Sequence, residues 1–176
     1  MHPVQGRAGA RERFRQRLVQ LTWEVPRGLR PEFVGTALLV AAVDQASKAA
    51  VLSRLQFGES VPLLAPLLRL TLWRNTGIAF GLLSGASEWV GVAAVLAAVW
   101  LVLHHRHRWH DSPLIRTGMG MVLGGAAGNL VDRVRYGYVV DFVQLPYWPI
   151  FNVADACIVV GGVLLALGSV RAGRPV

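Results

Sequence analysis

Three aspartates stand within one glycine-rich and otherwise apolar stretch, residues 124–162. Asp132 follows a run of small residues, Asp141 ends a β-branched run, and Asp155 lies near the start of an apolar run. A carboxylate costs about 2.5 to 3.5 kcal/mol at the centre of a membrane helix, so such residues need a compensating role. Two neighbouring carboxylates tend to share a proton, which leaves one as a base for water and the other as an acid for the leaving group. The pattern therefore predicts acid–base chemistry by Asp141 and Asp155.

Other chemistries fit the sequence less well. Four of the five histidines stand within residues 104–110, so no Ser-His-Asp or Cys-His set is expected beside the aspartates. From the residues alone, a paired-aspartate membrane hydrolase and a proton or ion relay in a transporter are equally supported. The lack of an internal repeat and the presence of a sheet-like segment favour an enzyme.

Composition places the chain among membrane proteins. Of its 176 residues, 53% are hydrophobic and only 16% are charged, whereas a soluble domain has about a quarter of its residues charged. The net charge of +8 comes almost entirely from arginines at segment ends, which does not make the basic face that nucleic-acid binding requires. The single cysteine, Cys157, excludes an internal disulfide and fits a small buried residue.

The order of apolar and polar segments predicts an α-helical integral membrane protein with four transmembrane helices and a small extracytoplasmic β-platform. Residues 56–87 contain two prolines and an alternating apolar–polar run, which indicates a twisted sheet at the outer surface. Residues 136–149 read as an aromatic-rich interfacial loop. The segments predicted to span the membrane are 33–55, 89–103, 114–131 and 150–170.

The distribution of basic residues sets the predicted orientation. Twelve Lys and Arg residues fall in the tail, the turn at 104–116 and the C-terminus, against six on the opposite side. Both termini should therefore be cytoplasmic and the aspartates should lie at the outer face. The predicted domains are a basic tail (1–32), a membrane domain (33–170) and a C-terminal tail (171–176). A signal peptide at the N-terminus is the disfavoured alternative, because the basic region is too long and lacks a suitable cleavage site.

Two further clusters have structural interpretations. Asp44 and Lys48 are spaced i, i+4, so they can pair on one face of the first predicted span, and a structural pair is favoured over direct catalysis. The histidines in 104–110 are interpreted as a solvated basic turn, not a metal site. No metal and no cofactor are expected.

A set of motifs, in order, resembles the bacterial lipoprotein signal peptidases (signal peptidase II). The resemblance covers about residues 33–170 and departs from the family's pattern in the basic tail and in the short segment between Asp141 and Asn152. It implies a four-span aspartyl endopeptidase of the bacterial cytoplasmic membrane. Its substrates would be diacylglyceryl-modified prolipoproteins, presented among membrane lipids and cut just before the lipidated cysteine. The motifs are Asp44-Gln45-Ala46-Ser47-Lys48, Asn75-Thr76-Gly77-Ile78-Ala79-Phe80, residues 124–133 (GGAAGNLVDR), Val139-Val140-Asp141-Phe142 and Phe151-Asn152-Val153-Ala154-Asp155.

The resemblance also implies roles for individual residues. Asp141 and Asp155 match the catalytic pair. The polar residues that match its support are Asn129, Asp132, Arg133 and Asn152, and those grouped with the substrate platform are Asn75, Gly77, Asp44 and Lys48.

Structural roles are the alternatives for these residues. The two catalytic candidates could be helix caps or partners of a nearby arginine, Asp132 could form an ion pair with Arg133, and the asparagines could bond helix ends. A non-catalytic lipoprotein chaperone, the remaining functional class, would tolerate loss of either acid.

Overall fold

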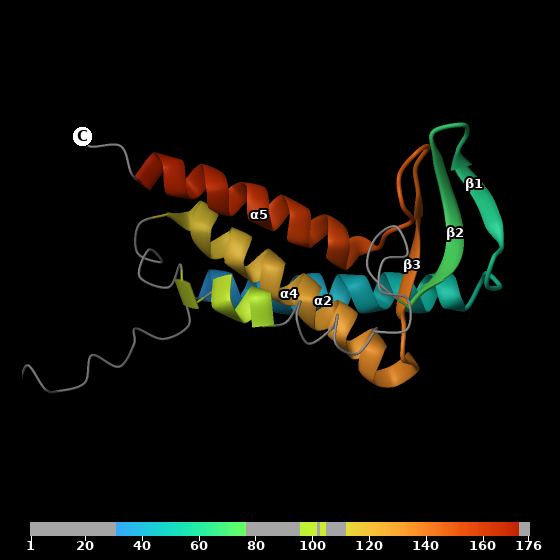
Figure 1. Cartoon of the computed structure of the whole chain (residues 1–176), viewed down its shortest axis with the longest axis horizontal. Coiled ribbons are helices and arrows are strands. Elements are labelled where there is room, and N and C mark those ends of the chain that lie inside the picture. The colour runs from blue at the N-terminus through green and yellow to red at the C-terminus, as the bar shows by residue number, and fades with distance from the viewer. Residues whose placement is uncertain (1–30, 77–95, 102, 105–111, 173–176) are drawn as a thin grey trace, which may run out of the picture. The chain divides into compact units, whose positions relative to one another are not determined.

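The computed structural model describes residues 31–76, 96–101, 103–104 and 112–172. The predicted tail at residues 1–32 lies almost wholly outside these ranges, so the domain boundaries stay predictions. Within the described ranges, long helices meet a three-stranded sheet at one end (Figure 1). Residues 96–101 and 103–104 are also helical. The elements are α2 (Pro31–Leu52), β1 (Ser60–Leu64), β2 (Leu68–Asn75), α4 (Pro113–Tyr136), β3 (Val139–Gln144) and α5 (Val153–Ala172).

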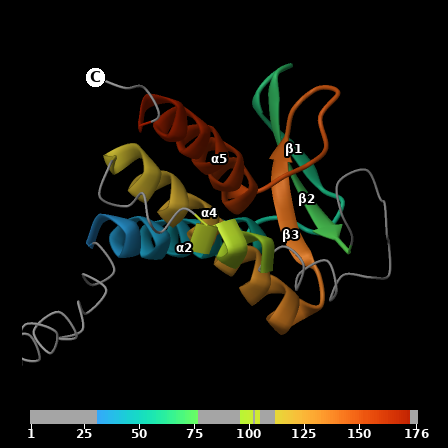
Figure 2. The same cartoon turned by 60° about the vertical axis from the view of Figure 1, so that its left-hand side comes forward.

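Helix α4 packs against both α2 and α5, and glycines allow the close approach. A Cβ atom added at Gly124 would lie 2.5 Å from the carbonyl oxygen of Ala37 on α2. One added at Gly125 would lie 2.6 Å from the carbonyl oxygen of Ala154 on α5. Only glycine permits such close backbone contact, so Gly124 and Gly125 serve the packing of α4 on its neighbours. Figures 1 and 2 show α2 and α4 ending at the sheet and α5 starting there.

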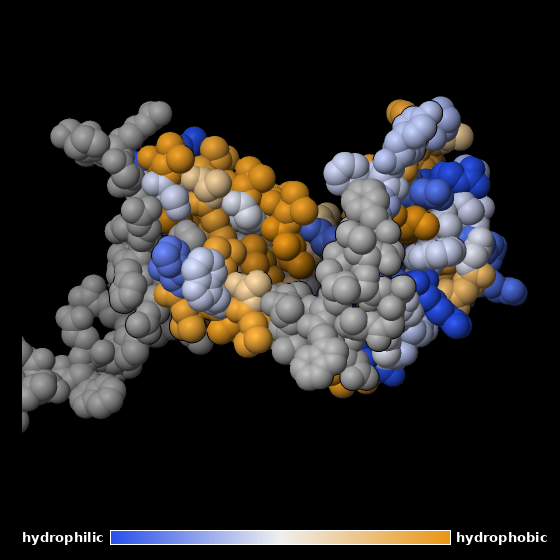
Figure 3. Space-filling model, viewed as in Figure 1, coloured by the Kyte–Doolittle hydropathy of each residue, from blue (hydrophilic) through white to orange (hydrophobic). Residues whose placement is uncertain are grey.

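The outer surface of the helices is apolar. Figure 3 shows hydrophobic surface over the helices and mostly hydrophilic surface over the sheet. A soluble protein rarely exposes apolar patches of this kind, so the helices are suited to lipid. Large apolar side chains that are at least 47% exposed on α2 and α5 are Leu38, Leu39, Val43, Val159, Val160, Val163, Leu167 and Val170.

Two described helices are long and apolar enough to cross a membrane, α2 and residues 153–171 of α5. By length and composition they agree with the first and last predicted spans. Most of the second predicted span, 89–103, lies outside the described residues, and α4 is not among the two candidates. The prediction of four transmembrane helices therefore stays a prediction.

The three strands form an antiparallel sheet in the order β1-β2-β3. The first two strands confirm the sheet predicted within 56–87. The third corrects the prediction of a loop over 136–149, because residues 139–144 pair with β2. The pairing sets Trp73 opposite Asp141 and Asn75 opposite Val139. Asn75 is therefore a diagonal neighbour of Asp141 across the strands.

Two boundaries differ from the prediction in ways that matter for the site. Helix α4 continues beyond residue 131 and ends at Tyr136. Gly137 caps it in the left-handed conformation, with a φ of 77°. Helix α5 begins at Val153, not at residue 150, so Asp155 lies in its first turn rather than about a turn and a half down.

A small apolar core fixes the sheet to the helices. Val51, near the end of α2, packs with Leu72 of β2 and with Val140 and Phe142 of β3. Apolar contact of this kind holds the sheet at a fixed place on the helix ends. The residue between Val140 and Phe142 is Asp141, whose side chain alternates to the other face of the strand.

Candidate active site

Asp141 is held in the middle of β3 by two side-chain amides. Its Oδ2 accepts a hydrogen bond from Asn75 Nδ2 at 2.9 Å, and its Oδ1 accepts one from Asn152 Nδ2 at 2.7 Å. The residue is only 1% exposed. A carboxyl group buried this deeply needs such partners, and the amides fix both of its oxygens.

Asp155 lies at the third position of α5 and takes part in a capping box with Asn152. The Asp155 N–H donates to Asn152 Oδ1 at 2.9 Å, and the Asn152 N–H donates to Asp155 Oδ2 at 3.2 Å. This reciprocal pair satisfies two N–H groups at the start of the helix. Asn129 Nδ2 donates to the other carboxylate oxygen, Oδ1, at 2.8 Å. The same bonds that start α5 therefore orient Asp155.

Asn152 joins the two aspartates through one side chain. Its amide nitrogen donates to Asp141 Oδ1 and also to Asn129 Oδ1 at 3.0 Å, while its amide oxygen accepts from Asp155. Asn152 is completely buried. The structure thus brings Asp141 and Asp155 into one hydrogen-bonded network with Asn129 and Asn152.

The pKa of Asp141 is raised from its ordinary value of 3.8 to about 7, chiefly by burial and then by the negative charge of Asp155. The hydrogen bonds from Asn75 and Asn152 and the charge of Lys48 act in the opposite direction. At neutral pH this carboxyl group is close to half protonated. It can therefore give a proton to one reaction partner, which an ordinary aspartate cannot do at this pH.

A buried ion cluster lies beside the two aspartates. Lys48 Nζ lies 2.8 Å from Asp44 Oδ2 and 2.8 Å from Asp132 Oδ2, and it donates to Asn129 Oδ1 at 2.9 Å. The predicted i, i+4 pair of Asp44 and Lys48 is confirmed. Asp44 is 0% exposed and Lys48 2%, however, so the structure places both inside the protein and not on a substrate platform.

Arg133 does not form the ion pair considered for it. The ion partner of Asp132 is Lys48, whereas Arg133 donates from its Nη1 to the carbonyl oxygen of Asn129 at 3.3 Å. Adjacent residues on a helix point in different directions, which is why the sequence neighbours do not pair. The Arg133 guanidinium still lies within electrostatic reach of both Asp141 and Asp155.

One polar residue of the network was not singled out from the sequence. Gln45 Nε2 donates to Asp132 Oδ1 at 2.8 Å and to the carbonyl oxygen of Gly128 at 3.1 Å. Its position next to Asp44 on the first span was the available signal. Two other predictions fall outside the described residues: Gly77 of the platform and most of the histidine turn at 104–110.

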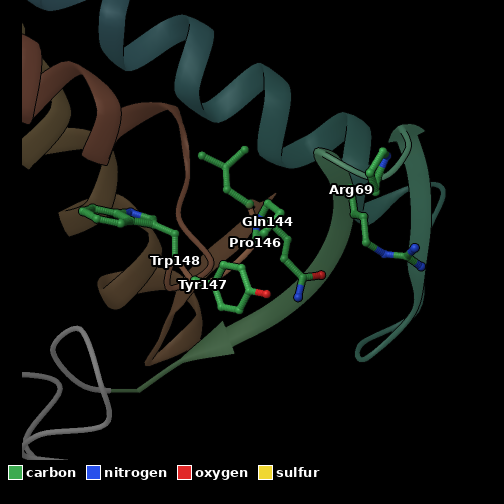
Figure 4. A pocket seen from close by; sticks show the side chains of 7 residues that line it. Arg69, Gln144, Pro146, Tyr147 and Trp148 are labelled. Carbon is green, nitrogen blue, oxygen red and sulfur yellow. The ribbon is translucent and has the colours of Figure 1, made fainter.

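A hollow of about 320 Å³ lies on the sheet side of the protein, apart from the aspartates. Figure 4 shows Trp148 and Arg69 at opposite sides of it, with Tyr147 and Gln144 between them. None of the predicted catalytic residues lines this hollow. It lies beside the loop that follows β3, and its lining is Pro66, Arg69, Gln144, Leu145, Pro146, Tyr147 and Trp148.

Comparison with known proteins decides the family. A family model described as signal peptidase (SPase) II matches residues 36–171. The chain belongs to the signal peptidase II family. Membership confirms the resemblance drawn from the motifs and makes the chain a peptidase.

Relatives and solved structures agree with the signal peptidase II family. A lipoprotein signal peptidase of Moorella thermoacetica is 46% identical over 134 residues, covering 76% of this chain and 89% of that protein. One from Syntrophomonas wolfei is 44% identical over 135 residues, covering 77% and 90%. A bacterial membrane enzyme solved by the in meso method at 1.9 Å resolution matches with a TM-score of 0.69 and 27% identity, covering 79% of this chain and 92% of that one. Together with α2 and α5, these findings support a membrane protein.

Proposed function

We propose that this chain removes signal peptides from diacylglyceryl-modified prolipoproteins, cutting just before the lipidated cysteine, with Asp141 and Asp155 as the acid–base pair. The observation that supports this most directly is that Asn152 bonds both carboxyl groups at once. Two carboxyl groups of unlike protonation can divide the proton transfers of peptide hydrolysis between them.

In the proposed reaction, the ionised Asp155 takes a proton from water. The hydroxide oxygen forms a bond to the carbonyl carbon of the residue before the cysteine. Asp141 gives its proton to the peptide nitrogen, the C–N bond breaks, and the products are a carboxylic acid and the free amine of the cysteine. The raised pKa of Asp141, about 7, leaves a proton available for this step at neutral pH.

The neighbouring polar residues would position the pair. Asn75 and Asn152 hold Asp141, and Asn129 holds Asp155. Arg133 places positive charge near both carboxyl groups, where it can stabilise negative charge on the attacked carbonyl. Asn75 also lies at the end of β2, where the predicted platform begins, and Gly77 is assigned to that platform by its motif alone.

The place of the pair in the fold suits a substrate embedded in lipid. Asp141 lies on the sheet and Asp155 lies in the first turn of an apolar helix, and the surface is mostly hydrophilic over the sheet and hydrophobic over the helices (Figure 3). A lipid-modified peptide could keep its acyl chains beside the helices while its scissile bond reaches the carboxyl groups. With the arginine distribution, this supports an active site at the outer face and cytoplasmic termini.

The test is cleavage of a diacylglyceryl-modified prolipoprotein in detergent by wild type, Asp141→Asn and Asp155→Asn. Each aspartate variant should lose cleavage while keeping a folded elution profile, and Glu59→Gln, which changes an exposed carboxylate, should cut normally. Cleavage by both variants would reject the catalytic assignment. An inactive wild type that instead carries protons across a liposome membrane would favour the relay, since a peptidase needs no separated compartments.

A further inference from the structure

Beside the proposed catalytic pair, three buried charged groups bind one another: Lys48, Asp44 and Asp132, each with three polar partners. We propose that Lys48, Asp44 and Asp132 form a positioning unit that fixes the proposed catalytic aspartates relative to each other. The unit acts on the backbone: each of its two carboxylates holds the peptide N–H of the residue just before one catalytic aspartate. This inference rests on the proposed function.

The first carboxylate holds the start of α5. Asp44 Oδ1 accepts a hydrogen bond from the N–H of Ala154 at 2.9 Å, within a fully buried contact. Ala154 directly precedes Asp155 in the first turn of the helix. An anionic acceptor at a helix N-terminus makes a strong, charge-assisted bond. Asp44 therefore fixes the position of Asp155 relative to α2.

The second carboxylate holds β3. Asp132 Oδ2 accepts a hydrogen bond from the N–H of Val140 at 3.0 Å, also fully buried. Val140 directly precedes Asp141. The two hydrogen bonds, here called the backbone clamps, are thus equivalent. In each, a carboxylate from a long helix binds the backbone one residue before a catalytic candidate.

Lys48 and Gln45 link the two clamps. The three hydrogens of the Lys48 ammonium are matched by acceptors on Asp44, Asp132 and Asn129, at 2.8, 2.8 and 2.9 Å. Gln45 Nε2 makes a second bridge, at 2.8 Å to Asp132 Oδ1 and 3.3 Å to Asp44 Oδ2. The positions of the two backbone clamps are therefore tied together through α2.

The Lys48 contact also fixes the orientation of one amide in the site. Asn129 Oδ1 accepts from both Lys48 and Asn152, so the amide oxygen must face them. The amide nitrogen then faces Asp155 and donates to it at 2.8 Å. If the lysine were absent, this oxygen would lose one of its two donors, and the orientation of the amide would be less firmly fixed.

Stability alone gives no reason for this arrangement. A buried ion cluster is seldom more stable than well-packed apolar residues of the same size, since removing charges from water offsets their attraction. The geometry offers a different reason, because both clamps end on the residue before a reacting group. Small displacements of such groups can lower a rate by about 10²-fold.

The experiment compares Asp44→Asn, Asp44→Leu, Asp132→Asn, Asp132→Leu and Lys48→Met with wild type on a diacylglyceryl-modified prolipoprotein in detergent. Each variant should lower kcat about 10- to 100-fold and change KM less than twofold, because the unit touches no substrate. Asparagine keeps an acceptor for the backbone N–H and leucine does not. At each position the asparagine variant should therefore retain a higher kcat than the leucine variant.

Two controls separate positioning from folding. Ile115→Ala opens the buried core in the first turn of α4, at the end remote from the sheet (Figure 1), and should lower Tm with kcat unchanged below that Tm. The double variant Lys48→Met with Asp44→Asn has the same net charge as wild type. It should recover Tm relative to Lys48→Met, while kcat stays low because the link between the clamps is missing.

Recovery of kcat in parallel with Tm in the double variant would overturn the proposal, as would a wild-type kcat in the asparagine variants and Lys48→Met. A rise in KM at constant kcat would also overturn it, since that result indicates substrate contact. If the leucine variants do not accumulate as folded protein, the kcat and KM values of the asparagine variants and of Lys48→Met test the proposal. Cleavage by Asp141→Asn and Asp155→Asn would instead reject the proposed function, whatever the unit does.

Discussion

Replacing Asp141 with asparagine should stabilise the folded protein at alkaline pH while it abolishes cleavage. The pKa of Asp141 is raised from 3.8 to about 7, chiefly by burial and then by the charge of Asp155. The folded state thus holds this proton at pH values where the unfolded chain has lost it. The stability that Asp141 contributes is fully present below about pH 3.8 and is lost as pH rises through about 7.

The size of the effect follows from the two pKa values. At about 1.4 kcal/mol for each pH unit, ionised Asp141 lowers the free energy of unfolding by about 4 kcal/mol relative to the neutral acid. About 3 kcal/mol of this loss falls between pH 5 and pH 8.5. Asparagine does not ionise and so avoids this loss of stability. It offers only one oxygen to the two donors, Asn75 and Asn152, which costs about 1 to 3 kcal/mol at every pH.

The measurement is Tm in detergent for wild type and Asp141→Asn at pH 5 and pH 8.5. For a chain of this size, 1 kcal/mol shifts Tm by about 2 to 4 °C, so the Tm of the variant relative to wild type should rise by about 5 to 10 °C between the two pH values. Glu59→Gln is the control. The Glu59 side chain is exposed, and the difference in Tm between this variant and wild type should be the same at both pH values. An equal difference at both pH values for Asp141→Asn would refute the reasoning.

Three further predictions follow from particular contacts. The cleavage rate should fall as pH rises through about 7, because Asp141 must hold a proton to act as the acid, and a flat profile from pH 6 to 8.5 would contradict this role. Gly128→Ala should lower both Tm and kcat, because its Cβ would lie 2.5 Å from a buried carboxylate oxygen; Gly162→Ala meets nothing within 4 Å and should stabilise α5 by about 0.5 to 1 kcal/mol. Asn152→Ala should lower Tm and reduce kcat about 100-fold or more, whereas Ser112→Ala, which removes the N-cap of α4, should cost about 1 kcal/mol and leave kcat unchanged.

The sequence was most informative where physical rules act locally. Long apolar runs predicted α2 and α5 to within a few residues, and the alternation at 68–74 predicted the strand that became β2. The third strand was assigned to a loop although residues 139–144 are rich in β-branched and apolar side chains. Its partner lies more than 60 residues away in the sequence, and pairing over that distance is decided by tertiary contacts.

The site was predictable as a set of residues but not as a set of contacts. The i, i+4 rule correctly paired Lys48 with Asp44, because both lie on one helix face. The same lysine also binds Asp132, on another helix, and no local rule gives that contact. Asp132 was instead considered with its sequence neighbour Arg133, whose side chain points elsewhere. The sequence therefore identified which polar residues belong to the site, while the packing of α2 on α4 determined how they pair.

Asp155 shows why fold and chemistry cannot be separated at this site. Its carboxylate closes the capping box that begins α5, and the same group is the proposed base. When it takes a proton from water it becomes a weaker acceptor for the N–H groups of Asn152 and Asn129. The start of the helix and the proposed base therefore depend on the same hydrogen bonds. A residue that capped α5 equally well without ionising would hold the fold and lose the reaction.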